Sequence, residues 1–149
     1  DDYTQHDAGV YKISGNSVSL IVPNATGMAA SGYYIFTFND PYGGTTGSSY
    51  SVYDILSNST VKLNLSGDSD HPIVSPAAIA VDPITGNIFI ASRQKDPDTG
   101  CPANLPGFVN VYQGYGPNAT PGQFVESFQT GVEPHKIEFV HGTAKIVFE

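Results

Sequence analysis

The side chains of this 149-residue chain that could act on a ligand gather in a few polar loops. The candidates are Tyr42, His71, Arg93, Lys95 and His135, which stand in or beside segments rich in Gly, Pro, Asp and Ser. Arg93 and Lys95, two of only six basic residues, can donate hydrogen bonds to phosphate, carboxylate or amide groups. Tyr42 offers a flat apolar surface, and the two His rings can change charge near neutral pH. We predict that these five residues form a ligand site; the simpler interpretation is ordinary solvated surface.

A metal site at Asp68, Asp70 and His71 is the first alternative use of these residues. Carboxylate and imidazole groups suit several divalent ions. However, the sequence offers no second close pair of His or Cys ligands, and Asp-Ser-Asp-His is typical of a polar turn before Pro72. We therefore predict no metal ligand.

Catalysis finds little support in the sequence. It contains no Gly-x-Ser-x-Gly elbow, no phosphate-binding Gly loop and no His pair of a zinc hydrolase. Asp96 and Asp98 are typical turn formers, and Cys101 has no His base near it in sequence. We predict no catalytic residue, and the sequence indicates no particular cofactor; an enzyme stays the alternative to a binding protein.

An internal repeat indicates which elements position these residues. Residues 74–90 (VSPAAIAVDPITGNIFI) align without a gap on residues 132–148 (VEPHKIEFVHGTAKIVF), 58 positions later. Each copy reads as two short strands joined by a turn that contains Gly. His135 takes the place of Ala77 at the start of the first strand. This exchange suggests a ligand group, although a hydrogen bond to a neighbouring loop would also explain it.

The whole chain reads as short strands of four recurring types, a to d, and as an all-β fold. The third strand of each unit carries a Val-Tyr pair, at 10–11, 52–53 and 111–112. The predicted strands are, in order, c 9–13, d 17–22, a 28–30, b 33–39, c 50–56, d 60–65, a 77–81, b 87–92, c 108–113, d 124–129, a 136–140 and b 145–148.

Four-stranded antiparallel units in series are typical of β-propeller blades. The segment VDPITGNIFIAS, followed by FVNVY and FVESFQTGVEPHKIEF, resembles the YVTN/NHL-like blades of bacterial surface propellers. Within that group the chain looks most like secreted propellers of gut Bacteroidetes, which include surface lipoproteins that capture cobalamin. The resemblance implies one propeller segment over residues 1–149, with blades at 24–67 and 68–130 and a split blade from strands 9–22 and 132–149.

The predicted strands are too few to close a propeller ring. The strands amount to three blades, whereas propellers usually have about 4–8. Two explanations stay open: the chain is part of a longer propeller, or two copies associate and complete each other's split blade.

The predicted topology puts the long loops on one face. Loops 40–49, 67–76 and 93–107 emerge there, whereas the turns at 14–16 and 83–86 lie on the opposite face. Long loops on a rigid scaffold usually carry binding function. We therefore expect the ligand site on the long-loop face.

The net charge and the resemblance to surface propellers limit which classes of partner we expect. The net charge of −8 disfavours nucleic acid, and no apolar run approaches the roughly 20 residues of a membrane span. The resemblance implies an extracellular or cell-surface binding protein. We expect a small molecule such as a corrinoid, a glycan or a protein as its ligand; a lactonase- or lyase-like propeller enzyme and a protein-interaction scaffold are the alternatives.

Overall fold

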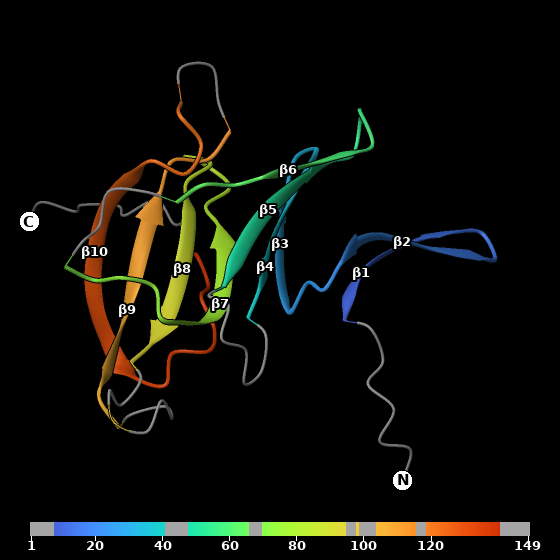
Figure 1. The fold of residues 1–149 in the computed structure, drawn as a ribbon. Helices are drawn as coiled ribbons and strands as arrows, with labels where there is room; N and C mark the ends of the chain where they lie inside the picture. Colours follow the sequence, from blue (N-terminus) through green and yellow to red (C-terminus); the bar gives the residue numbers. More distant parts are fainter. Residues whose placement is uncertain are drawn as a thin grey trace, which may run out of the picture.

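The described part of the chain is built entirely from β-strands (Figure 1). The structure, a computed structural model, describes residues 8–40, 48–65, 70–94, 98, 104–115 and 119–140. Its strands are β1 (Gly9–Ser14), β2 (Ser17–Pro23), β3 (Gly27–Ser31), β4 (Tyr34–Asn39), β5 (Ser49–Asp54), β6 (Ser59–Lys62), β7 (Ser75–Val81), β8 (Ile88–Arg93), β9 (Pro106–Tyr112) and β10 (Phe124–Val132).

The strands form three antiparallel sheets. β1 and β2 make a two-stranded hairpin, and the other strands make two four-stranded sheets in chain order, β3-β4-β5-β6 and β7-β8-β9-β10. In Figure 1 the two four-stranded sheets stand face to face, and the hairpin extends from the far side of the first. No sheet closes on itself in the part of the chain that the structure describes, so the propeller stays a prediction.

Short turns with suitable side chains hold the strand register. Between β7 and β8, Asp82 accepts hydrogen bonds from the Ile84 amide (3.0 Å) and the Thr85 hydroxyl (2.6 Å). Gly86 then adopts a φ of 74°, which L side chains rarely adopt. The Asp-Pro-Ile-Thr-Gly-Asn sequence therefore turns the chain within a few residues, and Val81 pairs directly with Ile88.

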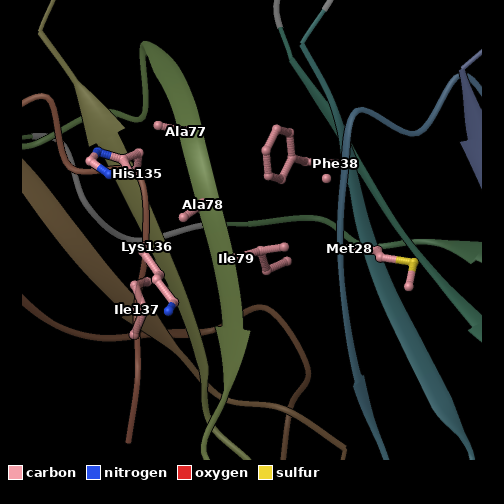
Figure 2. Close-up of a pocket in the computed structure, with 9 residues that line it drawn as sticks. Met28, Phe38, Ala77, Ala78, Ile79, His135, Lys136 and Ile137 are labelled. Carbon is pink, nitrogen blue, oxygen red and sulfur yellow. The ribbon is translucent and has the colours of Figure 1, made fainter.

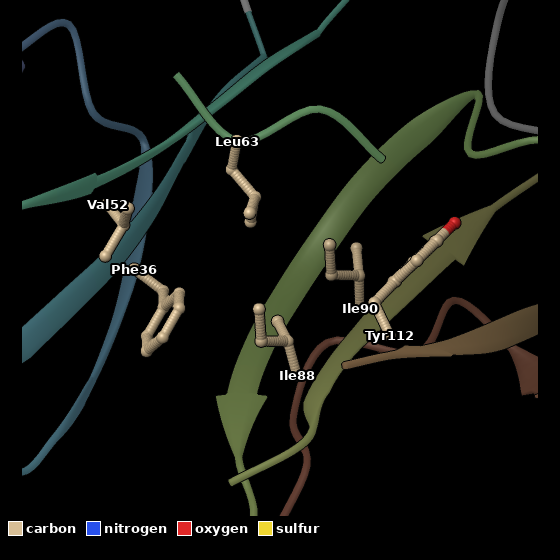
Figure 3. Close-up of a cluster of buried hydrophobic side chains, with 6 residues drawn as sticks. All are labelled: Phe36, Val52, Leu63, Ile88, Ile90 and Tyr112. Carbon is tan, nitrogen blue, oxygen red and sulfur yellow. The ribbon is translucent and has the colours of Figure 1, made fainter. Parts of the chain in front are cut away.

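A shared apolar core joins the two four-stranded sheets. Alternation along each strand puts one set of side chains on the facing surfaces. Figure 3 shows these side chains pointing into the space between the sheets. We call this set the central core: Phe36, Val52, Leu63, Ile88, Ile90 and Tyr112, each at most 4% exposed. Burial of this apolar surface is the main term that holds the two sheets together.

A second, smaller core joins the hairpin to the first sheet. Val10 of β1 and Val22 of β2 are buried against Tyr53 of β5, with Ile35 of β4 packed beside them. Val52 and Tyr53 are neighbours on β5, so their side chains project to opposite faces. The first four-stranded sheet is therefore packed on both sides.

Ten of the twelve predicted strands are confirmed, with bounds that differ by a few residues. The strand expected at 136–140 is not observed: these residues form no ladder of hydrogen bonds with any other described segment, which a strand requires. Phe139 packs its ring instead on Phe89 of β8, with centroids 4.9 Å apart. The last predicted strand, 145–148, lies outside the described residues.

Candidate functional site

A groove of about 250 Å³ lies where the first strands of the two four-stranded sheets come together (Figure 2). β3 and β7 make the main approach between these sheets apart from the central core. The segment 135–137, which follows β10, completes the groove. The lining residues are Gly27, Met28, Phe38, Ala77, Ala78, Ile79, His135, Lys136 and Ile137.

Small residues make room for this groove. Gly27 of β3 pairs with Phe38 of β4, and a Cβ on Gly27 would collide with the Phe38 ring. Ala77 and Ala78 on β7 present only methyl groups to the opposite wall. Any larger residue at position 27 would displace the Phe38 ring.

The polar side of the groove comes from two consecutive residues, His135 and Lys136. Glu133 has a φ of 54°, which bends the chain just before them. The Nδ1 atom of His135 lies 3.0 Å from the Glu133 carbonyl oxygen. Because a carbonyl only accepts, Nδ1 carries the proton, and Nε2 is the nitrogen that can act toward a ligand.

Lys136 pairs with Glu138 on the same segment. A hydrogen bond from Lys136, and then its positive charge, lower the pKa of the Glu138 carboxyl below its usual range. Both side chains are well exposed, so the pair is weak and Lys136 can turn to an anionic ligand at small cost.

His71, a predicted site residue, lies away from the groove. Its ring packs on Phe108 of β9, with centroids 4.3 Å apart. Its carbonyl oxygen accepts a 2.6 Å hydrogen bond from the buried Asn110, which also accepts one from the Ser127 hydroxyl (2.8 Å). This network ties the 70–74 segment to the second sheet, which gives His71 a packing role.

Arg93 ends β8, at the end of the sheet where the long loops emerge. Its Nε atom is buried and has no hydrogen-bond partner among the described residues. The neighbouring Ser92 accepts hydrogen bonds from the amides of Val74 (3.1 Å) and Ser75 (3.2 Å), which fixes the start of β7. Arg93 is therefore near the strand that lines the groove without lining it.

Two further polar residues at this end were missed by sequence reasoning. Asp40 accepts hydrogen bonds from Ser48 (2.7 Å) and Ser75 (3.4 Å), and so links β4 to β7. The Tyr50 hydroxyl is buried beside Ser48 and makes no well-formed hydrogen bond within the described ranges. Burial, and then the nearby Tyr112, raise the pKa of Tyr50 above its usual value. An Asp and a Tyr at strand ends carry no distinct sequence signal, because their neighbours come from another sheet.

Of the three predicted site residues that the structure describes, His135 lines the groove and the other two do not. His71 and Arg93 occupy other positions at the long-loop end, and Tyr42 and Lys95 lie outside the described residues. Asp68, the first member of the metal alternative, also lies outside them. Where the chain is described, no three His, Cys, Asp or Glu side chains come close enough to hold a metal ion.

Comparisons with known proteins add no relative. No family model, no curated protein and no solved structure matches this chain significantly. The described residues include no helix long and apolar enough to cross a membrane.

Proposed function

We propose that this chain is a non-catalytic binding protein that takes a small ligand into the groove between β3, β7 and residues 135–137. The observation that carries the proposal is the position of His135. The repeat puts His135 at the position that Ala77 holds in the first copy, and both residues line the same groove. A groove with apolar walls and a few polar groups is the usual form of a small-molecule site.

The lining chemistry suggests the ligand class. Phe38, Ile79 and Met28 offer apolar and aromatic surface, Lys136 offers hydrogen-bond donors and positive charge, and the Nε2 atom of His135 offers a further polar contact. The ligand that fits both is an apolar or flat molecule with an acidic group, such as a carboxylate or phosphate.

The size of the groove limits how much of a ligand it can hold. A volume of about 250 Å³ is below the roughly 300–1,000 Å³ of sites that enclose a drug-sized molecule. The groove would therefore accept a small acid, or one edge of a larger ligand. A corrinoid, suggested by the resemblance to cobalamin-capturing surface propellers, and a glycan are both of the second kind.

The proposal includes the architecture and the location. Each four-stranded sheet runs in chain order from a strand at the groove to a strand at the far edge. In a propeller the first strands of the blades surround the axis, so the two sheets would be consecutive blades and the groove would lie at the axis. An extracellular or cell-surface location follows from the same resemblance.

The test is binding measured by calorimetry with cobalamin, small aromatic carboxylates and neutral oligosaccharides. For a ligand that binds, His135→Ala and Lys136→Ala should each weaken affinity about tenfold, which corresponds to about 1.4 kcal/mol. Lys62→Ala on the exposed strand β6 is the matched control and should leave affinity unchanged.

The same titration separates the groove from the long-loop end. If His71→Ala or Arg93→Ala abolishes binding while His135→Ala leaves it intact, the ligand lies among the loops and the groove assignment is wrong. Loss of binding in the groove variants alone, with an unchanged melting temperature, supports it.

A further inference from the structure

The hairpin at one end of the sheet stack exposes a set of apolar side chains. On the hairpin, Tyr11 pairs with Leu20 and Ile13 pairs with Val18, so these four side chains share one face. All four are between 45% and 75% exposed. We call this surface the hairpin face. A contiguous apolar patch on an edge hairpin is typical of an interaction surface.

The Val-Tyr pairs of β5 and β9 show which neighbour covers the equivalent face in the two four-stranded sheets. On β9, Tyr112 packs toward the preceding sheet as part of the central core. On β5, Tyr53 likewise packs toward the preceding element, the hairpin. In both pairs the Tyr faces what comes before it in the chain, and the Val faces away.

The same rule applied to β1 identifies the missing neighbour. Val10 faces the following sheet and is buried against Tyr53. Tyr11 therefore faces toward a preceding sheet, but no sheet precedes the hairpin in the described residues. Tyr11 is 47% exposed, whereas Tyr53 is 5% and Tyr112 is 3% exposed.

The last sheet presents the opposite surface. Val109 and Val111 of β9 project away from the central core and are already buried, at 4% and 1% exposed. Phe128 of β10, paired with Val109, lies on that same side. Phe128 is 46% exposed. The chain after β10 returns over this surface, where Phe139 contacts Phe89.

We propose that the hairpin face of one copy docks on this side of the β7–β10 sheet of a second copy, against the exposed Phe128 and the segment that follows β10. The packing would repeat the one seen between consecutive sheets within the chain. The same copy cannot supply the surface, because its own β3–β6 sheet lies between the hairpin and the β7–β10 sheet (Figure 1).

Strand pairing supports the same partner. In both four-stranded sheets the third strand pairs with the second, β5 with β4 and β9 with β8, whereas among the described strands β1 pairs with β2 alone. In sequence, residues 145–148 match residues 87–90, because Ile146 aligns with Ile88. The open edge of β1 is therefore a second contact at which the partner copy can add a strand.

Reciprocal docking would join two copies about a two-fold axis. The contact is apolar, whereas each copy carries a net charge of −8. Salt should therefore strengthen the association by screening the repulsion between copies.

Light scattering coupled to size exclusion tests this assembly. Wild-type protein at tens of micromolar should have twice the chain mass of 15.8 kDa. Ile13→Ser and Val18→Ser should each return it to the single-chain mass, with an unchanged circular dichroism spectrum because both side chains are exposed. Ile84→Ser, at an equally exposed apolar side chain in the β7–β8 turn, should stay dimeric.

A synthetic peptide of residues 132–149 gives an independent readout. In excess it should compete for the β1 edge and convert the dimer to a complex of one chain with one peptide. A single-chain mass for the wild type at every concentration and salt level overturns the proposal. So does a dimer that persists in both Ser variants.

Discussion

Val52-Tyr53 on β5 and Val10-Tyr11 on β1 are the same dipeptide at the same place in two repeating units. In β5 both side chains are buried, because a sheet covers each face. In β1 only Val10 is buried, and Tyr11 is 47% exposed. The local sequence therefore determines the strand and the facing of its side chains, while burial depends on a neighbouring sheet.

The contrast extends from single residues to whole regions. The two four-stranded sheets share a core of large, fully buried side chains, whereas the hairpin buries one Val from each strand. A two-stranded hairpin alone is marginally stable in water. We therefore expect substitutions in the central core to have large effects, and the same substitutions on the hairpin face to have small effects on the isolated chain.

The largest difference should come from Ile90→Ala compared with Ile13→Ala. Ile90 is fully buried, so its truncation should lower the free energy of unfolding by about 2–5 kcal/mol. Ile13 is 75% exposed, and its truncation should change that value by less than about 0.5 kcal/mol. Urea denaturation at low protein concentration measures both. Equal losses would refute the contrast, and Ile90→Val offers a milder version if the Ala variant does not fold.

A smaller effect is expected at Asn110, the polar residue buried beside the central core. Asn110→Ala removes the donor to the His71 carbonyl and the acceptor of the Ser127 hydroxyl. The loss should be about 1–3 kcal/mol, because buried polar groups are left unsatisfied. Ser127→Ala removes only one of these bonds and should cost less. The assignment of a packing role to His71 is wrong if Asn110→Ala is neutral in thermal unfolding.

Two tyrosines of β5 sharpen the comparison further. The Tyr53 hydroxyl donates to Asn58 Oδ1 at 3.0 Å, whereas that of Tyr50 makes no well-formed hydrogen bond among the residues described. Tyr53→Phe should therefore cost about 0.5–1.5 kcal/mol, and Tyr50→Phe should be neutral or slightly stabilising. Chemical denaturation at neutral pH distinguishes them. A larger loss at Tyr50 would mean that its hydroxyl has a partner in solution.

The smallest predicted effect is a pH dependence at Tyr50. Burial raises the pKa of its phenol above the usual value, so the folded state holds the proton longer than the unfolded state. The resulting stability is fully present below the unfolded pKa of about 10 and is lost as the pH rises above it. Between neutral pH and pH 10.5 this ionisation should lower the free energy of unfolding of the wild type by up to about 0.8 kcal/mol. Tyr50→Phe lacks the phenol and should not show this loss. Unfolding curves of both proteins between pH 8 and 10.5 that stay parallel would contradict this.

The sequence predicts the strands well because their signals are local. Period-2 alternation, the Val-Tyr pairs and the Asp-Pro-Ile-Thr-Gly-Asn turn all act within a few residues. The strand expected at 136–140 failed because a strand needs a hydrogen-bonded neighbour as well as a suitable sequence. The repeat supplies the sequence, but the neighbour must come from elsewhere.

The candidate site was less predictable because it depends on contacts between sheets. His135 could be picked out from the sequence because it replaces the Ala77 of the other repeat copy, and it does line the groove. Sequence alone could not show that His71 packs on Phe108, or that the Phe38 ring occupies the space where a side chain on Gly27 would lie. It also gave no signal for Asp40, whose partner Ser75 is 35 residues away in the chain.

The difference between β1 and β5 can be measured directly by hydrogen–deuterium exchange at two protein concentrations. If a second copy covers the hairpin face and pairs with β1, then amides of β1 should become more protected at high concentration. Amides of β5 and β8, already paired on both sides, should exchange at the same rate throughout. Exchange of β1 that is fast and independent of concentration would contradict the account, because the hairpin would then lack a covering partner in solution.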